Sequence, residues 1–163
     1  MNPLHTSLSL GICLCFVATA RAETPVKPTP NYTVDSYDPK RNPADDLKMT
    51  AAKAKAGGKR VLIQVGGDWC GWCHLMTKYF QDNEKVASAL AKDYLIMKVN
   101  YSEENHNEEF LDKYPKIPGY PHLYVLDSDG KLLHSQNTEE LEEGKGYSET
   151  AVLKFLSKWA TRN

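Results

Sequence analysis

The chain has 163 residues, of which 41% are hydrophobic and 25% are charged, and its formal net charge is -1. This length and composition are typical of one soluble globular domain with an apolar core and a short additional segment. The charge is close to neutral and no basic block occurs, which argues against nucleic acid as a partner.

The first 22 residues have the layout of a secretory signal peptide. Residues 8–20 are mostly apolar, no acidic residue occurs before Glu23, and two A-x-A cleavage sites lie within residues 18–22. The apolar run is shorter than the roughly 20 residues that a membrane-spanning helix needs. We therefore expect export to the periplasm or the outside of the cell, with cleavage near Ala22 and no membrane span in the mature chain.

Residues 23–42 predict a flexible N-terminal tether. Prolines recur there among polar residues, at Pro25, Pro28, Pro30 and Pro39, a composition typical of extended linkers. The folded domain is accordingly expected over residues 43–163.

Helical and strand patterns alternate through this expected domain. Pro43 begins a helical pattern that Gly57 and Gly58 stop, and the next apolar run is typical of a buried strand. The order predicts an α/β fold, a mixed central sheet with helices on both faces. The expected elements are a helix over 43–56, a strand over 61–65, a helix from Cys70 with a second helical piece from about Asn83, a strand over 94–99, a short helix over 108–114, a hairpin of strands 122–126 and 131–134, and a helix over 148–159.

Cys70 and Cys73 are the cysteines that remain after the expected cleavage, because Cys13 and Cys15 lie in the signal peptide. In an oxidising compartment such a pair forms a disulfide or a set of metal ligands. The loop it closes is too short for the crosslink to stabilise the fold much. Cys70 stands at the start of a predicted helix, where unpaired N–H groups and the helix dipole stabilise a thiolate. We predict that Cys70 attacks and that Cys73, one turn later, resolves the mixed disulfide.

Four segments resemble the thioredoxin superfamily. Residues 61–73, which end in Cys-Gly-Trp-Cys, resemble its active-site strand and turn, and residues 97–100 resemble its next strand. Residues 117–125 resemble the segment that carries its cis-proline, and residues 129–131 the hairpin that follows. The resemblance covers roughly residue 43 to the C-terminus and is closest to exported bacterial thioredoxin-like proteins of the thiol-disulfide interchange type.

This resemblance implies a thioredoxin-like fold and thiol-disulfide exchange with a protein substrate, with a second protein as the redox partner that resets the cysteines. No bound cofactor is implied, because the cysteines carry the electrons. Pro121 would be cis and lie against the cysteine pair, with Pro118 as the competing position. Trp69 is expected to lie half in the core and half in the floor of the site, and Trp72 to be exposed for contact with a protein substrate. The expected supporting and substrate-binding residues are therefore Trp69, Gly71, Trp72 and Pro121.

Two features depart from the superfamily's pattern. Gln64 stands where thioredoxins commonly carry a buried aspartate that assists proton transfer at the second cysteine, and Lys98 matches the usual lysine partner of that acid. We therefore predict slower deprotonation of Cys73 than in a typical thioredoxin. The residues between the cysteines, Gly71 and Trp72, are compatible with a reductase, an oxidase and an isomerase.

Two other chemistries compete for the cysteine motif. With His74 it satisfies C-x-x-C-H, the motif of covalent haem attachment, but it lies inside an α/β pattern where no haem crevice is expected. Cys70, Cys73, His74 and Met76 are also ligand types suited to copper(I) or zinc, although two cysteines and one histidine fall short of a closed tetrahedral site. Thiol-disulfide exchange is the favoured interpretation, no metal site is expected, and His74 is expected to be a solvated side chain in the first turn of the helix. A copper-handling or thiol-binding module on the same fold is the alternative.

Overall fold

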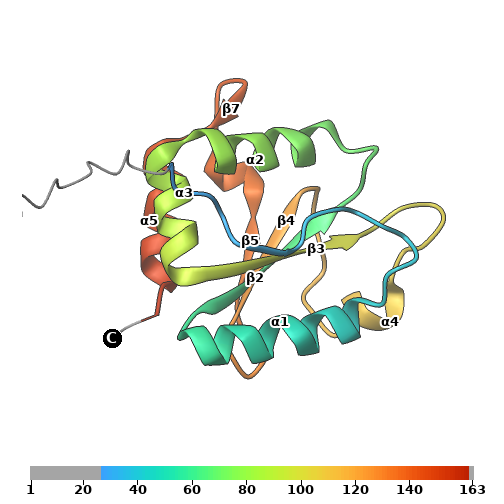
Figure 1. The fold of residues 1–163 in the computed structure, drawn as a ribbon. Helices are drawn as coiled ribbons and strands as arrows, with labels where there is room; N and C mark the ends of the chain where they lie inside the picture. Colours follow the sequence, from blue (N-terminus) through green and yellow to red (C-terminus); the bar gives the residue numbers. More distant parts are fainter. Residues whose placement is uncertain (1–26, 162–163) are drawn as a thin grey trace, which may run out of the picture.

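A computed structural model describes residues 27–161, so the predicted signal peptide lies outside the described residues. A mixed sheet of five strands forms the centre of the molecule, and helices cover both of its faces (Figure 1). The predicted thioredoxin-like α/β fold class is confirmed. In the order of the sheet the strands are β1 (Tyr32–Val34), β3 (Tyr94–Asn100), β2 (Arg60–Gly66), β4 (His122–Leu126) and β5 (Leu132–Asn137), of which β4 and β5 are antiparallel to their neighbours and the others are parallel.

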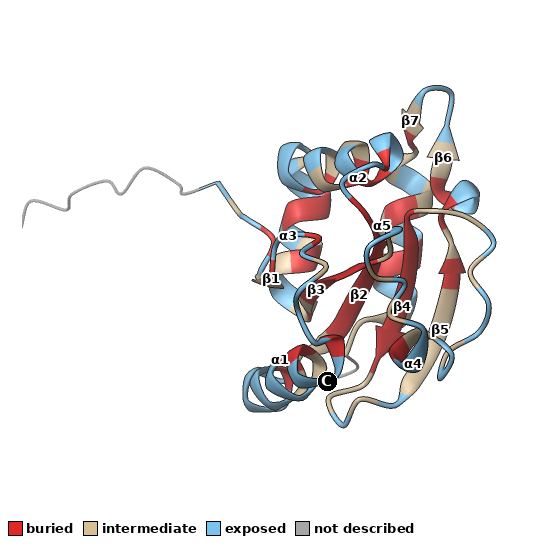
Figure 2. Ribbon diagram, turned by 90° about the vertical axis from the view of Figure 1, so that its right-hand side faces the viewer, coloured by how far each residue is buried: buried red, intermediate tan, exposed pale blue. Residues whose placement is uncertain are grey.

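The alternation of side chains along β2 creates two apolar cores, one on each face of the sheet. Leu62 points to the face covered by α2 (Gly71–Asp82), α3 (Glu84–Asp93) and α5 (Glu149–Trp159). Ile63 points to the opposite face, covered by α1 (Pro43–Gly57) and α4 (Glu108–Leu111). Figure 2 shows the central strands buried and the outer surfaces of the helices exposed. Because both faces of the sheet are covered, the sequence of β2 is a nearly continuous apolar run and not an alternation of apolar and polar residues.

The ends of the helices follow local side-chain chemistry. The Asn42 side chain accepts the backbone N–H of Ala44 and caps α1, which ends at Gly58 with a φ of 62°. Asn83 ends α2 and accepts the N–H of Val86 to begin α3. One asparagine therefore turns the chain from the helix that carries the cysteines into the next one.

The segment before α1 differs from the predicted tether. Residues 32–34 form β1, which pairs in parallel with the outer edge of β3. Val34 and Tyr37 are both buried. The prolines flank this short strand rather than interrupt it, so its backbone remains free to pair. The expectation that the folded domain begins at residue 43 is therefore wrong, because it already includes β1.

A small hairpin lies between β5 and α5, in an acidic part of the sequence for which no helix or strand was predicted. A 3-10 turn over Thr138–Leu141 leads into β6 (Glu142–Glu143), which pairs with β7 (Gly146–Tyr147). The hairpin rises beside α2 (Figure 1). In the part of the chain from residue 27 to residue 161, no helix combines the length and the apolar character needed to cross a membrane.

Candidate active site

Cys70 and Cys73 form a disulfide at the N-terminus of α2, with an S–S distance of 2.04 Å. Cys70 is the N-cap residue, and its Sγ accepts the backbone N–H of Cys73 at 3.1 Å. This N–H and the positive end of the helix dipole both favour negative charge on the Cys70 sulfur. Cys70 is 4% exposed, whereas Cys73 is fully buried. The geometry therefore distinguishes the two sulfurs in the way that an attacking and a resolving cysteine require.

Two glycines at the end of β2 let the backbone approach the site closely. A side-chain carbon placed on Gly66 would lie 2.4 Å from Cys73 Sγ. One placed on Gly67 would lie 2.3 Å from the Trp69 indole nitrogen and 2.7 Å from the carbonyl oxygen of Tyr101. No other residue type fits either position without displacement of these neighbours. Neither glycine was among the predicted site residues, although a glycine pair at the end of a buried strand is itself a signal of close backbone approach.

Two tyrosines pack against the disulfide. Tyr37 forms a buried cluster with Cys70 and Cys73. Tyr120, which lies just before β4, packs on this cluster. The peptide bond between Tyr120 and Pro121 is cis, as the resemblance implies. Pro121 is buried at the start of β4, and its carbonyl oxygen accepts the Thr138 hydroxyl at 2.5 Å. Tyr120, which was not among the predicted site residues, is thus a residue of this loop that packs on the cysteines.

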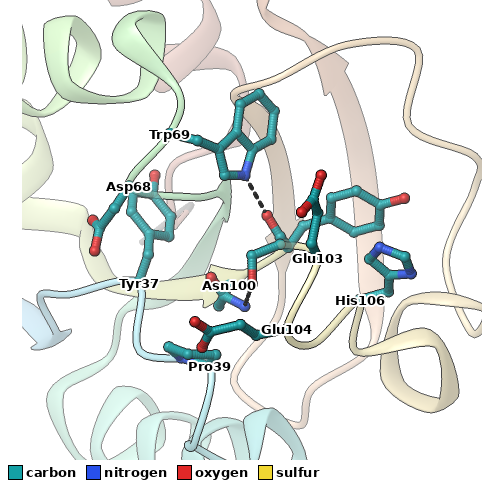
Figure 3. A pocket seen from close by; sticks show the side chains of 10 residues that line it. Tyr37, Pro39, Asp68, Trp69, Asn100, Glu103, Glu104 and His106 are labelled. Carbon is teal, nitrogen blue, oxygen red and sulfur yellow. Dashed lines mark hydrogen bonds between the residues drawn. The ribbon is translucent and has the colours of Figure 1, made fainter.

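Trp69 lies outside the core. It is 60% exposed, so the expectation that half of it would be buried in the core is wrong. Its indole N–H donates to the carbonyl oxygen of Tyr101 at 2.7 Å, which holds the ring at the rim of a cleft of about 730 Å³ (Figure 3). Tyr120 packs edge-on against Trp69 and stacks on Tyr101. Aromatic side chains line this cleft, among them Tyr37 of the cysteine cluster, and its acidic members are Asp68, Glu103 and Glu104.

Trp72 lies on the other side of the cysteine pair and is 37% exposed, as predicted. Its ring packs edge-on against Tyr147 of β7, whose hydroxyl donates to the Trp72 carbonyl oxygen at 3.3 Å. Trp72 also lines a smaller groove of about 160 Å³ with Gly119 and Tyr120. Gly71 is exposed, and a side-chain carbon placed on it would meet no atom within 4 Å. This side of the site is open to a partner.

Gln64 and Lys98 lie behind the cysteines. Gln64 is fully buried, and its side-chain amide donates to the Cys73 carbonyl oxygen and to the Thr77 hydroxyl, both at 3.4 Å. Lys98 is its register partner on β3 and is 8% exposed. Burial lowers the pKa of Lys98 below its ordinary value, and Asp35 and Asp68 partly oppose this shift. Its ammonium lies 5.0 Å from the centre of the Tyr37 ring, a distance at which a cation is attracted to an aromatic face.

His74 and the two cysteines, considered above as haem or metal ligands, have other partners in the structure. His74 is exposed, and its Nε2 donates to the carbonyl oxygen of Asp68 at 2.9 Å. Within residues 27–161, no group of three or more histidine, cysteine, aspartate or glutamate residues is arranged to hold a metal ion. In the disulfide both sulfurs are committed to each other, so neither is a thiolate ligand.

The chain is similar to several known proteins. A family model described as thioredoxin-like matches residues 42–128. A thiol:disulfide interchange protein DsbD from Pseudomonas sp. (strain JR1 / K1) is 28% identical over 172 aligned positions, which cover 96% of this chain and 28% of the relative. The corresponding Escherichia coli (strain K12) protein is 29% identical over 87 residues, which cover 53% of this chain and 15% of the relative. The chain thus spans less than a third of the length of these curated relatives.

Solved structures agree with the family model. A disulphide isomerase from Xylella fastidiosa Temecula1 superposes with a TM-score of 0.64 at 26% identity, over 75% of this chain and 94% of that chain. The C-terminal domain of DsbD from Neisseria meningitidis, in the oxidised form, shares the fold with a TM-score of 0.54 at 17% identity, over 78% of this chain and all of that chain. The chain therefore belongs to the thioredoxin-like family and carries the cysteine pair of its thiol-disulfide oxidoreductases.

Proposed function

We propose that the chain exchanges thiols and disulfides with other proteins outside the cytoplasm, through Cys70 as the attacking residue and Cys73 as the resolving one. The observation that carries this proposal is the Cys73 N–H directed at the Cys70 sulfur from the first turn of α2. It favours a thiolate at Cys70 and leaves Cys73 buried until a mixed disulfide forms.

The exchange conserves electrons within four sulfur atoms, two of this chain and two of the partner disulfide. In the reductive direction, the Cys70 thiolate attacks a partner disulfide, and one partner sulfur leaves as a thiolate. The Cys73 thiolate then attacks Cys70 Sγ, the bond between Cys70 and the partner breaks, and the second partner sulfur leaves. The protein disulfide is reduced by two electrons and the Cys70–Cys73 pair is oxidised by two. The reverse sequence donates a disulfide to a partner.

The location and the partners are supported by the sequence and by the relatives. The apolar leader with its A-x-A sites favours export, and the relatives described above are named as thiol:disulfide interchange proteins. Each turnover leaves the cysteine pair in the opposite redox state, so a second redox protein must reset it. We therefore propose two partners in alternation, a substrate protein and a protein that restores the starting state.

The docking surface is proposed to lie around the open side of the disulfide. Trp72 offers exposed aromatic surface, and Gly71 leaves space beside it. Gly119 and Tyr120, which precede the buried Pro121, line a groove together with Trp72. Exposed aromatic groups beside a groove are typical anchors for a partner chain. Trp69 flanks the same disulfide from the side of the acidic cleft.

The proposal is tested by trapping a mixed disulfide. The full chain carrying Cys73→Ser, with Cys13→Ser and Cys15→Ser so that Cys70 is its remaining thiol, is incubated with insulin, whose disulfides serve as the protein substrate, and products are separated without reductant. We expect a covalent adduct through Cys70, because the resolving sulfur is missing. The matched variant Cys70→Ser should give no adduct under the same conditions. Equal adduct from both variants, or none from either, would contradict the assignment.

A further inference from the structure

The Tyr37 hydroxyl is buried beside the disulfide without a hydrogen-bond partner. Tyr37 is 3% exposed, and its hydroxyl has no bond of normal geometry to any group in residues 27–161. The Gln64 side chain is near enough to oppose part of the rise in the pKa of the Tyr37 hydroxyl, but the contact lacks normal hydrogen-bond geometry, and the Gln64 side-chain oxygen is unpartnered in the same way. A buried hydroxyl without a partner costs free energy, so a state of the protein in which it is satisfied is expected.

The unpartnered hydroxyl lies next to a reacting atom. A side-chain carbon placed on Gly66 would be 2.4 Å from Cys73 Sγ and 3.1 Å from the Tyr37 hydroxyl oxygen. Sulfur and hydroxyl therefore border the same small space above the Gly66 backbone. In the disulfide the Cys73 sulfur is neutral and a weak acceptor. After reduction or mixed-disulfide formation the Cys73 sulfur can become a thiolate, which is a strong hydrogen-bond acceptor.

The surroundings keep Tyr37 protonated. Burial raises the pKa of its hydroxyl far above the ordinary value, so the hydroxyl acts as a donor and not as a base. The Lys98 ammonium over the ring is the nearest cation, and Asp35 and Asp68 are the acidic groups that act on this region. None of these groups forms a hydrogen bond to Tyr37 in the described part of the chain.

We propose that Tyr37 donates a hydrogen bond to the Cys73 sulfur whenever that sulfur is a thiolate. This inference rests on the proposed exchange reaction and assigns a donor to its resolving step. Cys73 loses its proton to solvent, the thiolate accepts the Tyr37 O–H, and its attack on Cys70 Sγ forms the Cys70–Cys73 bond. The partner sulfur leaves with the electron pair of the broken bond and takes up a proton. The segment that the sequence presents as a tether thus supplies a group to the active site.

The test separates attack from resolution. The full-length chain carrying Cys13→Ser and Cys15→Ser, so that Cys70 and Cys73 are its remaining thiols, is fully reduced and reacts with Ellman's reagent, dithiobis(nitrobenzoic acid). The first thionitrobenzoate released reports attack by Cys70, and the second reports resolution by Cys73. The rate of each release is followed as a function of pH. The test variant is Tyr37→Phe, which removes only the hydroxyl. The matched control is Tyr32→Phe, because Tyr32 also has an unpartnered buried hydroxyl and a ring near Lys98, at 5.5 Å, but does not belong to the cysteine cluster.

We expect Tyr37→Phe to raise the pH midpoint of the second release by about one unit, the shift expected for loss of one hydrogen bond to a charged group. The first release and the Tyr32→Phe profile should remain as in the wild type. Identical second-release profiles in all three proteins would overturn the proposal. Absence of either release from the wild type would instead refute the exchange reaction itself.

A measurement on the wild type keeps the proposal testable if Tyr37→Phe does not fold. Tyrosine absorbance is recorded while Cys73 is titrated in the reduced protein, with Tyr32→Phe as the reference. A tyrosine signal that follows the cysteine titration in both proteins supports the hydrogen bond. A signal absent from both contradicts it.

Discussion

Gln64 on β2 is the register partner of Lys98 on β3, and its amide donates to the carbonyl oxygen of Cys73. The resolving cysteine is therefore backed by an uncharged amide and a buried lysine, with no carboxylate in hydrogen-bond contact with either in residues 27–161. A buried amide can orient the cysteine but cannot accept its proton. This arrangement supports the prediction that Cys73 is deprotonated more slowly than in thioredoxins that carry an aspartate there.

Introducing that carboxylate should accelerate resolution. In Gln64→Asp the carboxylate can accept the Cys73 proton, and general-base assistance contributes about 100-fold or more where geometry is favourable. We expect the resolving step to become at least about tenfold faster near neutral pH. The control is Gln64→Asn, whose side chain has the shape of the introduced aspartate but carries no charge, and it should show no acceleration. An unchanged pH-rate profile in the aspartate variant would refute this account of the site.

The stability of the domain should fall on acidification because of His122, the residue after Pro121. His122 is 1% exposed, and burial lowers its pKa to about 4, with a smaller contribution from His134. The unfolded chain, with an ordinary pKa near 6.5, binds a proton between these values that the folded chain does not. The free energy of unfolding should therefore drop by about 2 kcal/mol between pH 7 and pH 5 on account of this group.

The His122 contribution is measured by urea unfolding at both pH values. His122→Gln should lose about 2 kcal/mol less between them than the wild type does. Parallel pH dependences in the wild type and His122→Gln would show that burial of this histidine is not linked to folding.

Gly66→Ala should disturb the disulfide, because the added carbon would lie 2.4 Å from Cys73 Sγ. Overpacking of this kind costs about 1–3 kcal/mol, which corresponds to a lower melting temperature by several degrees. Gly71→Ala is the matched control within the same motif, since its added carbon would meet nothing within 4 Å. Thermal unfolding of the oxidised proteins checks the difference. Equal melting temperatures for the two variants would contradict the close approach at Gly66.

Trp72→Ala should weaken the use of protein substrates but leave reaction with a small disulfide intact. Loss of a central aromatic anchor typically costs at least about 1 kcal/mol, or roughly fivefold or more in kcat/KM toward insulin. Reaction with Ellman's reagent should not change. Met49→Ala removes an exposed apolar side chain of α1, remote from the cysteines, and should affect neither reaction. A parallel loss toward both substrates in Trp72→Ala would assign Trp72 to the fold and not to docking.

The sequence predicts most of the fold because local patterns carry the information. The apolar run of β2 and the caps of α1 and α2 are properties of neighbouring residues. β1 was missed because a three-residue strand is stabilised by its pairing with β3, far along the chain. The β6–β7 hairpin was missed because strands of two residues leave no periodicity in an acidic run.

The residues of the site also fall into two groups, those predicted from local sequence and those that depend on contacts between distant parts of the chain. Cys70, Cys73, Trp72 and the cis bond before Pro121 follow from a motif and a resemblance, both of which are local in sequence. Tyr37 has no such signal, because its burial depends on where the chain before α1 crosses the sheet. The exposure of Trp69 depends on a hydrogen bond to Tyr101 that no spacing reveals.

In the proposed reaction Cys70 and Cys73 form one redox pair that exchanges with other thiols. The equilibrium of this pair with reduced and oxidised glutathione, followed by trapping of free thiols in the full chain carrying Cys13→Ser and Cys15→Ser, tests the proposal most directly. We predict a single two-electron transition between dithiol and disulfide, with a potential between about -270 mV, as in thioredoxin, and about -120 mV, as in the strong periplasmic oxidant. A pair that stays in one state at every glutathione ratio would contradict the proposal.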